Sequence, residues 1–121
     1  MIIRHLNLSL RNALRGLYHV ARKEPNFRIQ LVISALVIAL LGAVPLRTWE
    51  VVVIILLVVS VLTMELLNTA VEKFIDLLKP RLEVYVGVVK DIMAAAVLVT
   101  SFGAAVIGII IFHSHFIGWI K

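Results

Sequence analysis

The sequence contains no cysteine and few charged side chains. The absence of cysteine excludes a disulfide framework and thiolate chemistry. Only 16% of the 121 residues are charged, whereas 62% are hydrophobic, and the mean hydropathy is +1.08. A soluble domain of this size needs a polar surface that this composition does not supply. The chain is therefore expected to be an integral membrane protein of one domain.

Motifs for several other functions are missing as well. Neither the P-loop pattern GxxxxGK(S/T) nor a GxGxxG turn after a strand occurs, which argues against a P-loop or protein-kinase fold. The N-terminus has no apolar segment followed by a small-residue cleavage site, so no secretory signal is expected. Lysine and arginine number 12 against 7 acidic residues, but their distribution favours anionic lipid headgroups over nucleic acid.

Helical periodicity and apolar runs predict an all-α arrangement. Residues 4–23 repeat apolar side chains at three- and four-residue intervals with basic side chains beside them, which is typical of an amphipathic helix in the membrane interface. A helix packed on a soluble partner is the alternative for this segment. Three membrane-spanning helices are predicted at residues 27–44, 50–78 and 88–112. We expect connections at 46–50 and 79–87, and a short tail at 113–121.

The basic residues predict how these spans are oriented. Six lysines and arginines stand before residue 29 and four lie in residues 73–90. Only Arg47 lies in the first connection, and only Lys121 follows the third span. The positive-inside rule therefore puts the N-terminus and the second connection in the cytoplasm, and the C-terminus outside.

A polar face interrupts the second span at its cytoplasmic end. On a helix that turns roughly 100° per residue, this face is formed by Glu65, Asn68, Glu72 and Asp76. Such a face cannot pack against lipid and needs cations, hydrogen-bond donors or water. The pair Lys90–Asp91 precedes the third apolar run at the same end. We therefore predict a polar site that opens toward cytoplasmic ATP and Mg²⁺.

The residue types predict roles within this site. Glu65, at the edge of the apolar region, is a candidate general base toward an alcohol held at the interface. Glu72 and Asp76, nearer to water, suit Mg²⁺, which takes one or two protein carboxylates and leaves its other positions to phosphate and water. Glu24, at the start of the first span, is a further candidate ligand.

Three polar side chains complete the predicted site. Asn68 can both donate and accept hydrogen bonds in the cluster. Lys90 offers a positive charge to a polyphosphate, and Asp91 is placed to orient Lys90 or to bind a second metal ion.

Structural interpretations of the same residues remain open. Glu65 can pair with Lys90 to stabilise packing, and Asp76 can be solvated or paired with Lys73 or Lys79. Asn68 can join two spans, and Glu24 can simply end the first helix. His113 and His115 fit interfacial side chains better than a metal site, because no third ligand follows them.

A different class of protein also explains carboxylates within membrane spans. A non-enzymatic cation- or proton-coupled transporter usually carries them near the middle of the bilayer. Here they gather at one end, which favours an enzyme. Small residues in the third span, from Ala94 to Gly108, favour a tightly packed bundle or oligomer.

The segment Glu65-Leu-Leu-Asn68-Thr-Ala-Val-Glu72, with Asp76 and Lys90-Asp91, resembles the small bacterial membrane lipid kinases, namely prokaryotic diacylglycerol kinase and undecaprenol kinase. Arg15-Gly16-Leu17 and Glu24-Pro-Asn-Phe27-Arg28 match that family in order and spacing. The resemblance implies an ATP- and Mg²⁺-dependent enzyme of the bacterial inner membrane that phosphorylates a lipid hydroxyl, either undecaprenol or diacylglycerol. It also implies a homotrimer whose active sites are shared between neighbours.

The resemblance assigns roles residue by residue. Glu65 matches the catalytic base, and Glu24 and Glu72 match the metal ligands. The remaining matches are to the nucleotide and catalytic site: Gly16, Asn68, Asp76, Lys90 and Asp91.

The sequence also departs from the family. Met93 and Ala94 stand where relatives often have glycine or serine, and Gln30 stands where some have an ionisable residue. A basic contact to nucleotide near Arg4 or His5 is expected without a secure match. The motif details favour undecaprenol over diacylglycerol as the substrate.

Overall fold

The computed structural model describes residues 1–78, 81 and 83–120, and this part of the chain is helical without any strand. It comprises α1 (Ile2–Lys23), α2 (Pro25–Ala43), α3 (Thr48–Asp76) and α4 (Glu83–Ile120). Within these residues, three helices, α2 to α4, are long and apolar enough to cross a membrane. The all-α membrane fold with an N-terminal amphipathic helix is therefore confirmed.

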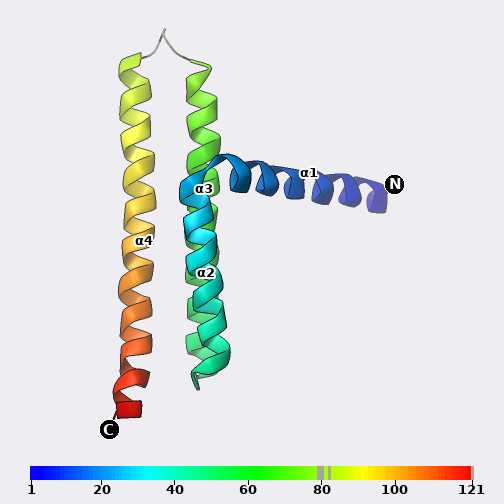
Figure 1. The fold of residues 1–121 in the computed structure, drawn as a ribbon. Coiled ribbons are helices and arrows are strands. Elements are labelled where there is room, and N and C mark those ends of the chain that lie inside the picture. The colour runs from blue at the N-terminus through cyan, green and yellow to red at the C-terminus, as the bar shows by residue number, and fades with distance from the viewer. Residues whose placement is uncertain (79–80, 82, 121) are drawn as a thin grey trace.

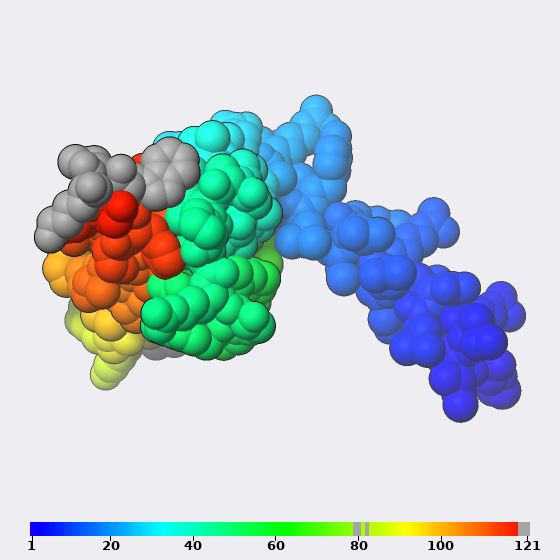
Figure 2. Space-filling model, turned by 90° about the horizontal axis from the view of Figure 1, so that it is seen from below, coloured from blue at the N-terminus to red at the C-terminus, as the bar shows by residue number. Residues whose placement is uncertain are grey.

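The α1–α2 junction is a sharp elbow at Glu24. Its backbone is extended, with φ −108° and ψ 109°, because Pro25 disfavours helix at the preceding residue and is itself suited to the first helical position. Across the elbow, the Arg28 guanidinium donates a hydrogen bond of 3.0 Å to the Arg22 carbonyl oxygen. As a result α1 lies across the direction of α2 and extends away from the bundle (Figures 1 and 2).

The lengths of the helices show which parts can lie within a bilayer. The 19 residues of α2 span about 28 Å at 1.5 Å per residue, close to a ~30 Å hydrocarbon core. The 29 residues of α3 and 38 residues of α4 are longer, and both helices continue beyond the level of α1 (Figure 1). Their ends on the α1 side therefore project past the surface on which an amphipathic α1 would lie.

Helix α3 is the centre of the bundle, because it packs against both α2 and α4. Few side chains are fully covered within the chain: Phe27 of α2 and Ile54 of α3 are each 2% exposed. Most large apolar side chains of α2 and α4 are exposed, as is expected of helices whose surroundings are lipid or another copy rather than water.

A buried acid–histidine contact joins α3 to α4 at the end of the bundle away from α1. The carboxylate of Glu50 accepts a hydrogen bond of 2.9 Å from the backbone N–H of Arg47, which caps the start of α3. His115 Nε2 lies 3.0 and 3.1 Å from the two oxygens of the same carboxylate. Glu50 thus fixes the start of α3 and the end of α4 together.

Helix α4 corrects two of the predictions. Its start at Glu83 lies within the predicted connection 79–87, of which residues 79, 80 and 82 are outside the described residues. The predicted tail at 113–121 is wrong, since the helix continues to Ile120. Ser114 donates to the carbonyl oxygens of Ile110 and Ile111, and His115 is tied to Glu50. The contact of His115 with Glu50 joins this end of α4 to the start of α3.

The predicted end of the second span at residue 78 lies two residues past the end of α3 at Asp76.

The Glu50–His115 contact can be tested by replacing its histidine. His115→Ala leaves a buried carboxylate with one partner fewer, which is destabilising. We expect the apparent Tm in detergent micelles to fall by about 5 °C, as followed by circular dichroism. The neighbouring His113→Ala, at an exposed position of the same helix, serves as the control. Equal Tm values for the two variants would contradict the stabilising role.

Candidate functional site

The polar face of α3 changes from buried to exposed along the helix. Glu65 is 4% exposed, Asn68 and Glu72 are half-buried, and Asp76 is exposed. These positions follow one another over 11 residues, or roughly 16 Å. Glu65 therefore lies deepest, and Asp76 lies at the end of the helix that projects past α1 (Figure 1).

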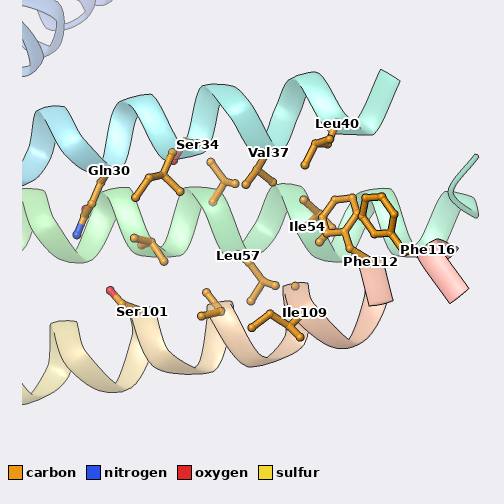
Figure 3. A pocket seen from close by; sticks show the side chains of 16 residues that line it. Gln30, Ser34, Val37, Leu40, Ile54, Leu57, Ser101, Ile109, Phe112 and Phe116 are labelled. Atoms are coloured by element: carbon orange, nitrogen blue, oxygen red, sulfur yellow. The ribbon is translucent and has the colours of Figure 1, made fainter. Parts of the chain in front are cut away.

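Glu65 is the centre of a group of carboxylates from two parts of the chain. The charges of Glu72, on α3, and of Glu24, at the elbow, act on its carboxylate. The amide of Gln30, on α2, also acts on this carboxylate, from a side chain that points toward α3 (Figure 3). The elbow thus brings Glu24 close to two residues that are more than forty positions away in the sequence. The two acids whose charges act on the predicted base are thus the two predicted metal ligands.

These carboxylates fit a magnesium ion that is held partly by a nucleotide. Among the described residues, no three Asp, Glu, His or Cys side chains converge closely enough to hold a metal ion by themselves. Mg²⁺ does not require this, because it commonly takes one or two carboxylates and completes its octahedron with phosphate oxygens and water. The donor set of Glu24 and Glu72 is of that kind.

A second polar contact lies farther along the same helices. Lys90 Nζ of α4 lies 3.3 Å from Asp76 Oδ1 of α3, and both side chains remain accessible. The ion pair of Asp76 is therefore with Lys90, across the helix pair, rather than with Lys73 on its own helix. Asp91 is exposed beside it. An ion pair this accessible contributes little to stability.

A pocket of about 480 Å³ opens between α1 and α3. It is lined by side chains of both helices and by Gly16; the polar ones are Asn12, Arg15, His19, Thr69 and Lys73. A Cβ atom at Gly16 would meet nothing within 4 Å, so glycine there leaves open space. Two permanent cations and several donors make this a pocket for an anionic ligand.

Sequence reasoning missed part of this pocket. It did not select Asn12 or His19, and it considered Lys73 only as a partner of Asp76. Asn12, Arg15 and His19 recur at three- and four-residue spacing on α1, which places them on one face. That spacing could have identified the α1 side of the pocket, but the side contributed by α3 depends on where the elbow places α1.

Comparisons with known proteins identify the family of the chain. The sequence pattern of the prokaryotic diacylglycerol kinase family matches residues 11–112, which include every predicted site residue. Undecaprenol kinase of Bacillus subtilis (strain 168) is 34% identical over 98 residues, which make up 81% of this chain and 80% of that protein. The resemblance seen in the sequence is thereby confirmed: the chain belongs to the prokaryotic diacylglycerol kinase family and is a membrane-embedded lipid kinase.

Proposed function

We propose that this lipid kinase transfers the γ-phosphoryl group of ATP to the hydroxyl of a membrane lipid alcohol, with Glu65 as general base and Mg²⁺ held by Glu24 and Glu72. The observation that carries the proposal is the buried Glu65 carboxylate, grouped with those two acids at the level where α1 meets the bundle. A lipid hydroxyl sits at the membrane interface, and an amphipathic α1 lies in that interface. The base is therefore at the depth of its substrate.

The transfer needs few parts from the protein. The Glu65 carboxylate accepts the proton of the lipid hydroxyl as the lipid oxygen forms a bond to the γ-phosphorus. The bond between that phosphorus and the β–γ bridging oxygen breaks, and ADP leaves with the electron pair. Burial of Glu65 keeps competing water away from the reacting oxygen.

The carboxylates at the elbow orient the nucleotide. Glu24 and Glu72 would hold Mg²⁺, whose charge offsets the negative charge that builds up on the phosphate oxygens during transfer. Glu24 is fixed for this purpose by the extended backbone of the elbow. Glu72 is fixed by its position two turns beyond Glu65 on one helix face.

Cationic and polar side chains provide for the rest of ATP. In this proposal the pocket between α1 and α3, with Arg15, Gly16 and Lys73 in its lining, receives the nucleotide. When ATP binds, Lys90 gives up part of its contact with Asp76 and contacts a phosphate oxygen instead. Asn68 and Asp91 contribute hydrogen bonds at the same end.

The acceptor lipid, the assembly and the orientation complete the proposal. The relative from Bacillus subtilis is named for undecaprenol, and we propose a polyprenol rather than diacylglycerol as the acceptor.

We propose a homotrimer in the bacterial inner membrane, because three spans alone leave most of their apolar surface uncovered. Its N-terminus faces the cytoplasm and its C-terminus the outside, as the basic residues predict.

The base assignment predicts a large loss of turnover in Glu65→Gln. The amide keeps the shape of the side chain but accepts no proton, so kcat should fall about a hundredfold or more. The measurement is transfer of labelled γ-phosphate from ATP to polyprenol and to diacylglycerol in mixed micelles. Glu83→Gln, an exposed position at the start of α4, should keep full activity. Unchanged kcat in a folded Glu65→Gln protein would refute the assignment.

The metal assignment predicts a changed requirement for magnesium in Glu72→Gln. Loss of one carboxylate ligand should raise the Mg²⁺ concentration for half-maximal activity at least about tenfold. Titration of Mg²⁺ at fixed ATP measures it. The assignment fails if the titration curve coincides with that of Glu83→Gln.

The nucleotide pocket predicts a selective effect of Gly16→Leu. Since a Cβ there has free space, the fold should tolerate leucine, but the side chain would take up pocket volume. We expect the KM for ATP to rise about tenfold while the KM for the lipid stays the same. Gly42→Leu, at an equally open glycine of α2, is the matched control. A rise in the lipid KM alone would place the nucleotide elsewhere.

A further inference from the structure

A groove of about 570 Å³ runs along the bundle between α2 and α4, across the surface of α3. It has a polar end, where Gln30, Ser34 and Ser101 lie, and an aromatic end at Phe112 and Phe116 (Figure 3). The other lining residues are Gly108 and residues with apolar side chains. A groove of this volume and composition matches sites that take a hydrocarbon ligand.

The polar end of the groove lies next to the acidic residues around Glu65. Gln30 lines the groove, its side chain points toward α3 (Figure 3), and its amide acts on the Glu65 carboxylate. Along α2, the groove extends from Gln30 to Leu40, which is about 15 Å at 1.5 Å per residue. A chain lying in it would therefore begin beside Glu65 and run toward the opposite side of the membrane.

Gln30 leaves one hydrogen-bonding atom unused at this junction. Its Oε1 atom is the buried side-chain acceptor without a hydrogen-bond partner among the described residues. A buried acceptor without a donor is destabilising, and such atoms in native proteins are usually completed by water or a ligand. Because Gln30 lines the groove, a donor lying in the groove can reach this atom.

We propose that the groove holds the hydrocarbon chain of a single-chain, long primary alcohol, whose hydroxyl donates to Gln30 Oε1. The inference rests on the proposed function and specifies its acceptor site. A hydroxyl hydrogen rotates about the C–O bond. The same group therefore donates to Gln30 when the alcohol binds, and to Glu65 when the proton leaves. Gln30 is thus a positioning residue for the acceptor.

The apolar lining explains why the occupant has one chain. A polyprenol presents only hydrocarbon behind its hydroxyl carbon, whereas a diacylglycerol carries two ester groups there, which need hydrogen-bond donors when buried. Beyond Ser34 and Ser101 the groove offers no polar side chain. A helix from a second copy would cover the apolar lining but leave the Gln30 acceptor without a donor unless a polar residue met it.

A photoreactive polyprenol tests occupancy independently of turnover. The probe carries a diazirine within its chain at about the length of the groove, roughly 15 Å from the hydroxyl, and mass spectrometry locates the adducts on the full-length protein in micelles. We expect adducts at the aromatic end, on Phe112 or Phe116, that unlabelled polyprenol competes away. Adducts confined to surfaces outside the groove would overturn the proposal. The proposal would also be overturned if a benzophenone placed at Val37 cross-linked two protein chains instead of the lipid.

Kinetics of two variant pairs separate a specific role from a structural one. Gly108→Leu narrows the groove at an open glycine. It should raise the KM for a 55-carbon prenol about tenfold and leave a five-carbon prenol unaffected. Gly118→Leu, an open glycine of α4 outside the groove lining, should change the KM of neither prenol.

Gln30→Leu should raise the KM of both prenols about fivefold to tenfold with a smaller change in kcat. Ser60→Ala is its control.

The outcomes distinguish this inference from the proposed function. Phosphorylation of polyprenol together with groove adducts and the expected KM changes supports both. Phosphorylation without groove adducts, or with Gly108→Leu equal to Gly118→Leu, overturns the groove and leaves the kinase reaction intact. Competed groove adducts without phosphorylation of any prenol support the binding site and overturn polyprenol as the acceptor.

Discussion

The arrangement depends on one buried carboxylate, that of Glu65, at the depth where the bundle meets the surface helix. A carboxylate in apolar surroundings is destabilising unless it has a partner, and two more acids lie within reach of its charge. Like charges so placed repel one another, and a divalent cation offsets this repulsion better than any single side chain. This repulsion is the physical basis on which we propose a metal-bound polyphosphate next to the membrane.

The elbow at Glu24 determines which residues lie near the Glu65 carboxylate. Pro25 ends one helix and begins the next, so α1 turns across the bundle instead of continuing along it (Figure 1). That turn brings the charge of Glu24 to act on Glu65 and forms the pocket between α1 and α3, to which α1 contributes Arg15. In the proposed function, a water-soluble nucleotide and a lipid alcohol meet from opposite sides of this site. The aqueous pocket lies under α1, and the apolar groove lies between α2 and α4.

Periodicity in the sequence was enough to predict the four helices and the shared face of Glu65 and Glu72, because both follow from local geometry. The contacts between helices were not predictable in this way. The pairing of Lys90 with Asp76 and of His115 with Glu50 depends on how α4 slides along α3, which no single helix specifies. The extension of α4 to Ile120 was missed for the same reason, since the partner of His115 lies 65 residues away. Gln30 was recognised only as a departure from the family, and its place in the groove lining depends on the position of α2.

The central claim is that Glu24 and Glu72 hold one divalent ion next to Glu65. The most direct measurement is solid-state NMR of the side-chain carboxyl carbons of glutamate in bilayers, with Mn²⁺ and a non-hydrolysable ATP analogue. The chain has five glutamates, and the account predicts strong paramagnetic broadening for Glu24, Glu65 and Glu72. It predicts little broadening for Glu50, at the far end of the bundle, or for Glu83. Sharp signals from Glu24 and Glu72 at saturating Mn²⁺ and nucleotide would contradict it.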